Sequence, residues 1–308
     1  MCGYMMAARS DNTVYKYFGA FKRWANFCQQ NDWEPIQAQP IHIAVYLTNL
    51  LDAGSSHHVI SSAIYAIKWV HEINDFPDPT NNAFVRNLHD SAKRITGHSI
   101  DKKDVVTTEM IIDLCNKYPD SKDPIEIRNL CMITMAFAGF LRYDELSSIR
   151  CNDIVIHSDH FSINIRKSKT DQLRAGDKVV ISEGSTSACP LQMLVRYMSI
   201  TSITTESGQF LFKPAYRSKT VCKLISKNKP LSYTTARENI VKMLLTVAPG
   251  MNFGLHSLRS GGVTAAANNN VGDRCLRRHG RWKRDQSKDV YIADSLEKRL
   301  QVTQHIGL

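Results

Sequence analysis

The sequence predicts a mainly helical protein with a small antiparallel β-hairpin, divided into two domains. Apolar residues recur at helical spacing through most of the 308 residues, whereas strict alternation is confined to a stretch near residues 160–181. A polar segment over residues 97–104 separates the two parts. The chain, 43% hydrophobic, is long enough for two cores. We therefore expect a helical domain over residues 1–98, a linker over 99–106 and an α+β domain over 107–308.

The first domain is predicted to contain four helices joined by short turns. An amphipathic stripe from Val14 to Cys28 predicts the first helix, which starts near Asn12 and ends at Asn31-Asp32. The other three are expected over residues 41–51, 59–73 and about 82–95. Basic residues on the first helix, such as Lys16 and Lys22, could meet a polyanion or form an ordinary solvated face.

The second domain begins with a helix that Thr107 or Thr108 can cap. Asp123-Pro124 opens the next helix, which is predicted to run through the apolar stretch Leu130 to Leu141 and to be buried. That stretch has about half of the roughly 20 residues needed to span a membrane. Arg142 follows at once, and burying it requires an anionic partner, either Glu145 or a bound phosphate.

The β-hairpin is predicted from two β-branched runs, His160 to Arg166 and Lys178 to Ile181, with lysines on or near the connecting tip. Further helices are expected from Pro190 through Met198 and over about Thr234 to Ala248, with a short extended piece over residues 210–212. A short helix through Leu296 and Leu300 is expected in the tail.

The net charge of +10 is unevenly distributed. Residues 1–106 contain ten basic and ten acidic side chains, so the whole excess lies in the remainder. A basic surface confined to one part favours a polyanionic partner, usually nucleic acid, although it also serves solubility. The eight cysteines form no Cys-x-x-Cys pair and have no histidine at zinc-like spacing. We expect reduced structural thiols in an intracellular protein, with no metal and no membrane segment.

Polar and basic residues gather near the C-terminus. His256 and Arg259 are three residues apart, hence on one face if the segment is helical, and Gly261-Gly262 permit a close backbone approach. A basic cluster precedes Tyr291, and it includes Arg277, Arg278, Arg281, Lys283 and Arg284. Taken alone, His256 is typical of a structural histidine and Tyr291 of a half-buried tyrosine.

The order of these motifs changes that interpretation. Five features follow one another along the chain: Arg142 with Glu145, the lysine hairpin, His-x-x-Arg, Gly-Arg-Trp, and a tyrosine nine residues beyond Trp282. In this order and spacing the sequence resembles the tyrosine recombinase family, over nearly its whole length. The resemblance implies a helical core-binding domain over residues 1–98 that clamps DNA, and a catalytic domain over residues 107–308.

The resemblance also implies a role for each residue. Tyr291 would attack the scissile phosphate and form a 3′-phosphotyrosine, while Arg142 and Arg259 clamp its nonbridging oxygens. His256 and Trp282 would donate hydrogen bonds to the phosphate, and His256 would also help to move the tyrosine proton. Lys169, preferred to Lys167 by its place in Arg-Lys-Ser-Lys-Thr, would protonate the leaving oxygen, and Glu145 would orient Arg142. The residues expected to contact DNA are Lys167, Arg277, Arg278, Arg281, Lys283 and Arg284.

The chain departs from the family pattern at Ser260, where a histidine is usual, and at Gly261-Gly262. In the detailed sequence of two motifs, His-Ser-Leu-Arg-Ser-Gly-Gly and Arg-His-Gly-Arg-Trp, the chain is similar to recombinases of eukaryotic DIRS-like and Ngaro-like retrotransposons. That likeness implies a site-specific recombinase or integrase of a mobile element, acting in the nucleus.

The expected partner is double-stranded DNA, and no cofactor, metal or ATP is needed, because the covalent intermediate conserves the bond energy. In the family the tail often docks on a neighbouring subunit, which implies a homotetramer on two DNA sites. The tail helix could equally pack on its own domain. Two other functions stay open: a type IB topoisomerase, and a non-catalytic DNA-binding protein derived from a recombinase.

Overall fold

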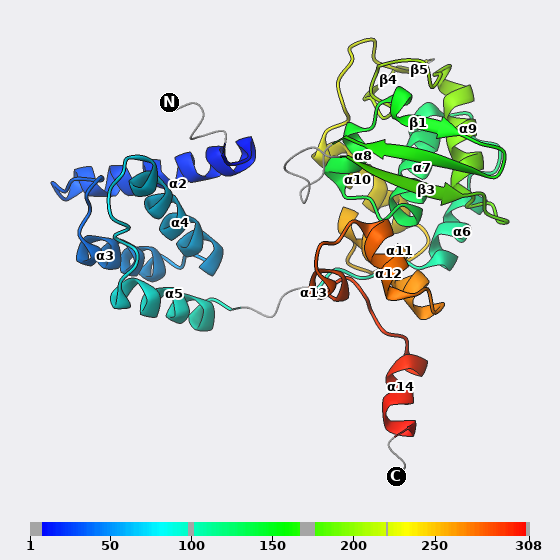
Figure 1. Ribbon diagram of the computed structural model, residues 1–308. Helices are drawn as coiled ribbons and strands as arrows, with labels where there is room; N and C mark the ends of the chain where they lie inside the picture. Colours follow the sequence, from blue (N-terminus) through cyan, green and yellow to red (C-terminus); the bar gives the residue numbers. More distant parts are fainter. Residues whose placement is uncertain (1–7, 98–101, 167–175, 220, 306–308) are drawn as a thin grey trace. The chain divides into compact units, whose positions relative to one another are not determined.

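The computed structural model describes residues 8–97, 102–166, 176–219 and 221–305. The chain forms two compact units, Met1–Asp101 and Lys102–Leu308 (Figure 1). Of the predicted linker, residues 99–101 lie outside the described residues. Val106 is buried within the second unit and donates its backbone N–H to the Ser257 carbonyl at 3.3 Å. The predicted linker therefore ends in a residue that is packed into the second unit.

The described residues of the first unit form four helices, at the places that the sequence predicts. They are α2 (Asp11–Gln30), α3 (Pro40–Asp52), α4 (His57–Ile73) and α5 (Ala83–Ile95). Helix α2 packs on α4, and α3 packs on α5. The core between them includes Trp24, Leu47 and Ile67, which are fully buried. The amphipathic stripes of the sequence therefore face one another in a small helical core.

The second unit contains most of the helices. They are α6 (Thr108–Asn116), α7 (Pro124–Ala138), α8 (Tyr143–Ser148), a 3₁₀ turn (Cys151–Asp153), α9 (Pro190–Thr201), α10 (Tyr233–Leu244), α11 (Leu255–Asn268), α12 (Asp273–Gly280), α13 (Asp285–Asp289) and α14 (Leu296–Gln304). Helix α7 forms the centre of the core, and α6, α9, α10 and α11 pack on it. None of the described helices combines the length and the apolar content that crossing a membrane requires.

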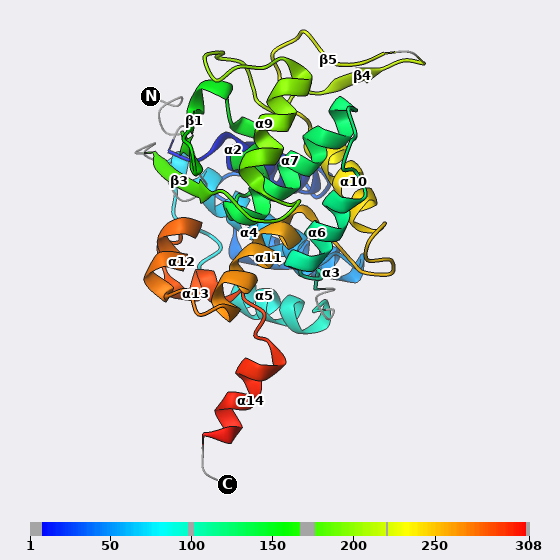
Figure 2. The same ribbon diagram turned by 90° about the vertical axis from the view of Figure 1, so that its right-hand side faces the viewer.

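A three-stranded antiparallel sheet covers α7 and α9 (Figures 1 and 2). Its strands are β1 (Ile154–Ile156), β2 (His160–Ile165) and β3 (Asp177–Ser182). In the register Ile163 pairs with both Ile154 and Val179, and its side chain enters the core. The predicted hairpin is thus confirmed, whereas β1 and a second small sheet, β4 (Ala215–Arg217) with β5 (Cys222–Leu224), were not predicted.

The end of α7 differs from the prediction. The helix begins as expected, with the Asp123 carboxylate accepting from the Ile125 backbone N–H at 2.8 Å, but it ends at Ala138 and not at Leu141. Phe140 takes a left-handed conformation with φ 47°, which an α-helix cannot continue. The chain turns there, and Arg142 becomes the N-cap of α8. The prediction that the apolar helix runs to Leu141, with Arg142 at its end, is therefore wrong.

Two adjacent glycines let α11 approach α7 closely. A Cβ atom on Gly261 would lie 2.1 Å from the Val106 carbonyl oxygen, and one on Gly262 would lie 2.0 Å from the Phe137 carbonyl oxygen. Any other residue would force these backbones apart. The predicted close approach is confirmed, and Arg259, just before these glycines on α11, donates to the Phe140 carbonyl directly after α7.

Candidate active site

Arg142 and Glu145 form the first part of the site, in the first turn of α8. The Arg142 Nη1 donates to Glu145 Oε1 at 2.8 Å, and the Arg142 backbone N–H donates to Oε2 at 2.9 Å. Glu145 therefore caps the helix and also holds the arginine side chain. The guanidinium of Arg142 is not fully buried, with 13% of its side chain exposed. It can meet a ligand while remaining fixed.

The Glu145 carboxylate is buried among three guanidinium groups. Besides Arg142, the Nη2 of Arg281 donates to Oε2 at 2.8 Å, and the Nη1 of Arg259 lies 3.9 Å from the same oxygen. Burial alone would raise the pKa of Glu145, but the charges of Arg281, Arg142 and Arg259 hold it below the usual value. One carboxylate thus neutralises part of a cluster that keeps a net positive charge.

Arg259 lies on α11 and is fully buried. Its Nη2 donates to the Gly280 carbonyl at 2.7 Å, and its Nη1 donates to the Phe140 carbonyl. Burial and the neighbouring charge of Arg142 lower its pKa to about 9, so the group stays protonated at neutral pH. A cation buried next to a second cation is costly, and an arriving anion would relieve that cost.

Two aromatic rings cover the Arg259 guanidinium. Its central carbon lies 4.3 Å from the ring centroid of Trp282 and 5.2 Å from that of Tyr291. The two rings are 5.5 Å apart, and the exposed His256 ring lies 6.4 Å from Tyr291 and nearly parallel to it. Residues far apart in the sequence therefore meet around one buried charge.

Trp282 can lie here because residue 280 is glycine. A Cβ atom on Gly280 would fall 1.7 Å from the Trp282 ring, so the indole packs directly on the backbone. The Nε1 of Trp282 and the Nε of Arg259 are both buried and have no hydrogen-bond acceptor among the described residues. Two unsatisfied donors beside a positive cluster are suited to bind an anion with several oxygens.

Thr264, one turn and a half beyond Arg259 on α11, anchors the Tyr291 segment. Its hydroxyl donates to the Tyr291 carbonyl at 3.2 Å and accepts from the Ala293 backbone N–H at 3.1 Å. These two bonds fix the backbone on both sides of Ile292. No role was predicted for Thr264, whose hydroxyl in an alanine-rich stretch is the one feature of the sequence that points to it.

The structure places the predicted site residues as follows. It brings Arg142, Glu145, His256, Arg259, Trp282 and Tyr291 together in one connected cluster. Lys169 and Lys167 lie outside the described residues. Strands β2 and β3, which precede and follow these lysines in the sequence, pair with each other from His160↔Ser182 to Ile165↔Asp177. The supporting carbonyls of Phe140 and Gly280 were not predicted, because sequence patterns carry no signal for backbone acceptors.

The residues predicted to contact DNA divide into two groups. Arg278, Lys283 and Arg284 are exposed, and Arg277 is half-buried, with its Nη1 3.7 Å from Asp285. Arg281 is instead buried, with its guanidinium turned inward onto Glu145 and backbone carbonyls. The prediction that Arg281 lies on the basic surface is wrong. Its left-handed backbone, with φ 57°, reverses the chain after α12 and directs its side chain into the protein.

Comparison with known proteins gives results that agree with one another. Residues 102–298 match the phage integrase family. The chain is 25% identical, over 292 residues, to an integrase/recombinase XerD homolog of Selenomonas ruminantium, covering 92% of this chain and 82% of the relative. It is 23% identical to the recombinase Cre of Escherichia phage P1, covering 67% and 60%. In fold it is similar to the XerH site-specific recombinase bound to palindromic difH substrate in a post-cleavage complex, with a TM-score of 0.60, 12% identity and coverage of 96% and 78%.

Proposed function

The chain belongs to the phage integrase family of tyrosine recombinases, which break and rejoin DNA, and on that premise we propose that Tyr291 is its DNA-cleaving nucleophile. The observation that carries the proposal is the position of Tyr291 against Arg259, with its ring centroid 5.2 Å from the guanidinium carbon. That arginine is linked through Glu145 to Arg142. A tyrosine beside two linked arginines has the elements required to attack a phosphodiester.

In the proposed cleavage step, the Tyr291 oxygen forms a bond to phosphorus while the bond from phosphorus to the 5′-oxygen breaks. Arg142 and Arg259 stabilise the negative charge that grows on the nonbridging oxygens. The buried N–H of Trp282 and the Nε–H of Arg259 supply further donors. His256, whose ring lies nearly parallel to that of Tyr291, helps to remove the phenol proton.

The departing 5′-oxygen needs a proton, and we assign it to Lys169 on the β2–β3 hairpin, with Lys167 as the alternative. The assignment rests on the motif in the sequence. Rejoining is the reverse reaction, in which a 5′-hydroxyl attacks the phosphotyrosine and releases Tyr291. The number of phosphoester bonds is conserved, so the cycle requires no nucleotide hydrolysis.

The DNA surface is proposed to include the exposed residues Arg278, Lys283 and Arg284, together with Arg277, close to the Tyr291 segment. These side chains carry positive charge without buried acidic partners, which suits contacts to phosphates. The XerH enzyme named above was solved on a palindromic substrate. A target with two inverted half-sites is therefore the expected DNA partner.

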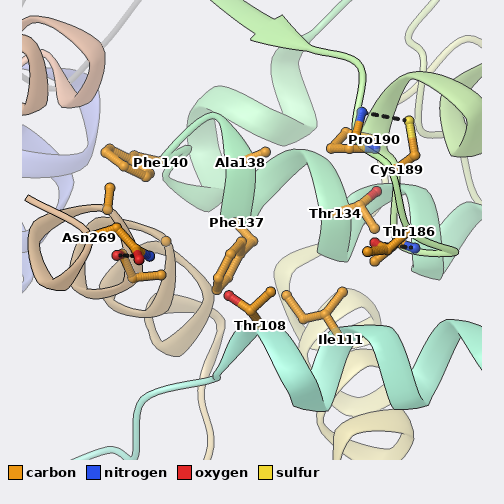
Figure 3. A pocket seen from close by; sticks show the side chains of 15 residues that line it. Thr108, Ile111, Thr134, Phe137, Ala138, Phe140, Thr186, Cys189, Pro190 and Asn269 are labelled. Carbon is orange, nitrogen blue, oxygen red and sulfur yellow. Dashed lines mark hydrogen bonds between the residues drawn. The ribbon is translucent and has the colours of Figure 1, made fainter. Parts of the chain in front are cut away.

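Assembly is proposed to use the tail helix α14. Leu296 and Leu300 are one turn apart on α14 and exposed to solvent, and α14 extends away from the rest of its unit in both views (Figures 1 and 2). The same unit contains an apolar cavity of about 320 Å³, lined by residues that include Ile111, Phe137, Pro190 and Ala266 (Figure 3). We propose that α14 of a second copy fills this cavity, and that four copies assemble on two DNA sites.

The biological origin is a separate proposal. The motifs His-Ser-Leu-Arg-Ser-Gly-Gly and Arg-His-Gly-Arg-Trp support the proposal that this recombinase integrates or excises a DIRS-like or Ngaro-like retrotransposon and acts in the nucleus. The two relatives named above come from a bacterium and a phage, so this proposed origin rests on the sequence motifs alone.

The proposal is tested by recovering the DNA that becomes attached to the protein. The full chain is incubated with a library of nicked duplexes, in which the short fragment that carries the released 5′-hydroxyl diffuses away after cleavage, so that rejoining cannot occur and the covalent intermediate is trapped. Covalent complexes are isolated under denaturing conditions and their DNA is sequenced. Wild type should retain one class of sequence, and Tyr291→Phe should retain none. DNA retained equally by both proteins would contradict the proposal.

A further inference from the structure

Arg281 occupies an unusual position for a basic residue in a DNA-binding segment. Only 6% of the residue is exposed, and its neighbours Lys283 and Arg284 are exposed. Its backbone is left-handed, with φ 57° and ψ 40°, a conformation that L-residues with a side chain rarely adopt. A strained backbone that persists in the protein must be compensated by the contacts of the residue.

Those contacts involve both nitrogen ends of the guanidinium. Nη2 donates to Glu145 Oε2 at 2.8 Å and to the Phe140 carbonyl at 3.0 Å, and Nη1 donates to the His279 carbonyl at 2.6 Å and the Gly139 carbonyl at 3.3 Å. A planar fork with five N–H donors can satisfy acceptors on two sides at once, which a lysine ammonium cannot do with the same geometry.

Three of the four acceptors lie in the region of the α7–α8 turn, and the fourth, the His279 carbonyl, lies on α12, which directly precedes Arg281. Gly139 and Phe140 form the turn between α7 and α8, and Glu145 holds Arg142 at the start of α8. Arg281 itself directly precedes Trp282, on the segment that leads to Tyr291. Its side chain therefore links the segment that carries the nucleophile to the turn that carries the first phosphate-clamping arginine.

Arg281 also determines which arginines the Glu145 carboxylate contacts. Its donor occupies Oε2, the oxygen that lies only 3.9 Å from Nη1 of Arg259. If Arg281 were removed, this carboxylate oxygen would keep the Arg142 backbone N–H, and the nearest other cation would be Arg259. Glu145 would then turn toward Arg259 and compete with a phosphate for that guanidinium.

We propose that Arg281 is a positioning residue for DNA cleavage, which holds Glu145 on Arg142 and so leaves Arg259 for the phosphate. This inference rests on the proposed function, because it concerns the same reaction. Arg281 touches neither DNA nor the reacting atoms. Its effect on the rate is exerted through Glu145.

The test compares Arg281→Met, Arg281→Lys, Glu145→Gln and the double variant Arg281→Met/Glu145→Gln. For each full-length protein, the rate of adduct formation at saturating DNA and the Kd for DNA are measured separately. We expect Arg281→Met to slow cleavage about 100-fold, the usual size of a misplaced catalytic group, with little change in Kd. Arg281→Lys should recover only part of the rate, because it restores the charge without the fork.

The double variant decides whether Arg281 acts through Glu145. If it does, removing both side chains slows cleavage no more than removing one, because coupled residues are not additive. If the fold-losses in cleavage rate of the two single variants multiply in the double variant, the two residues act independently and the inference is overturned. Arg278→Met is the matched control: this exposed arginine lies three residues earlier, and its loss should weaken DNA binding and reduce the salt dependence. If Arg281→Met shows the same change in Kd and salt dependence and no loss of rate, Arg281 is a DNA contact and the inference fails.

The pH profile gives a readout that loss of folding would not produce. Burial raises the pKa of Glu145 and Arg281 counters that effect, so Arg281→Met should raise this pKa. Because the ionised carboxylate is the functional form, the variant should lose cleavage at a higher pH than wild type as the pH falls. An unshifted profile would overturn the inference. Wild type without an adduct would overturn the proposed function itself, and the inference with it.

Discussion

The guanidinium carbon of Arg259 lies 4.3 Å from the ring centroid of Trp282, while the indole Nε1 of Trp282 has no acceptor among the described residues. The ring shields a buried charge, and its N–H remains for a ligand. Trp282 therefore has two separable contributions, a packing surface for Arg259 and a hydrogen-bond donor.

Replacing Trp282 by phenylalanine keeps an aromatic ring and removes the donor. We expect single-turnover cleavage to fall roughly 10- to 100-fold, the effect of losing one hydrogen bond of about 1.5–3 kcal/mol to a charged group. Trp33→Phe is the matched control, because Trp33 stacks on His42 in the other unit. Cleavage at the wild-type rate by Trp282→Phe would show that the indole N–H does not bind the phosphate.

Gly280→Ala should disturb the site by steric overlap. The new methyl group would fall 1.7 Å from the Trp282 ring, so the indole has to move away from Arg259. We expect a loss of about 1–3 kcal/mol in the free energy of unfolding, as in other overpacked sites, and a change in tryptophan fluorescence. Gly272→Ala, just before the same helix, has nothing within 4 Å and should be near neutral in urea unfolding. Equal stability of the two variants would contradict this placement of Trp282.

The identity of the general acid can be tested with a substrate whose leaving group needs no proton. A 5′-bridging phosphorothiolate releases a thiolate, which leaves far more readily than an alkoxide because a thiol has a pKa of about 8.5. Lys169→Ala should cleave ordinary DNA about 10²- to 10⁴-fold more slowly and recover on the sulfur substrate. Lys167→Ala should show no such recovery. If the sulfur substrate rescues Lys167→Ala instead, the two lysines exchange roles.

The tail is expected to act between subunits. Leu296→Ser with Leu300→Ser removes two exposed apolar side chains that, once buried against a partner, would contribute together about 3–6 kcal/mol. The variant should form adducts on single sites yet associate at least about 100-fold more weakly, as measured by light scattering of the DNA complex. Val271→Ser, also exposed and in the same unit, is the control. Unchanged assembly would mean that Leu296 and Leu300 do not hold the subunits together.

The sequence predicted the four described helices of the first unit and the long central helices and paired strands of the second, because hydrophobic periodicity identifies the buried face of an element. It missed short elements such as α8, α12 and α13. The stripe from Val14 to Cys28 became α2, and the alternation between Phe161 and Ile165 became β2. The errors arose where local conformation was decided by tertiary contacts. Phe140 is apolar and fits a helix, yet its positive φ ends α7, and its carbonyl accepts from Arg259 and Arg281.

The same distinction applies to the site. Motif order grouped Arg142, His256, Arg259, Trp282 and Tyr291, and the structure brings them together. Arg281 could not be assigned in this way, because a basic residue among other basic residues looks like a surface charge. Only its left-handed backbone directs it inward to Glu145. The supporting role of Thr264 depends on two backbone atoms that no sequence pattern identifies.

The most direct test of the central claim is to identify the amino acid that carries the DNA. A trapped covalent complex is digested with nuclease and protease, and the peptide that retains a nucleotide is sequenced by mass spectrometry. The account predicts that the peptide contains Tyr291 with the nucleotide joined through its 3′-phosphate, and that Tyr291→Phe yields no such peptide. A nucleotide on any other residue, or one joined through a 5′-phosphate, would contradict it.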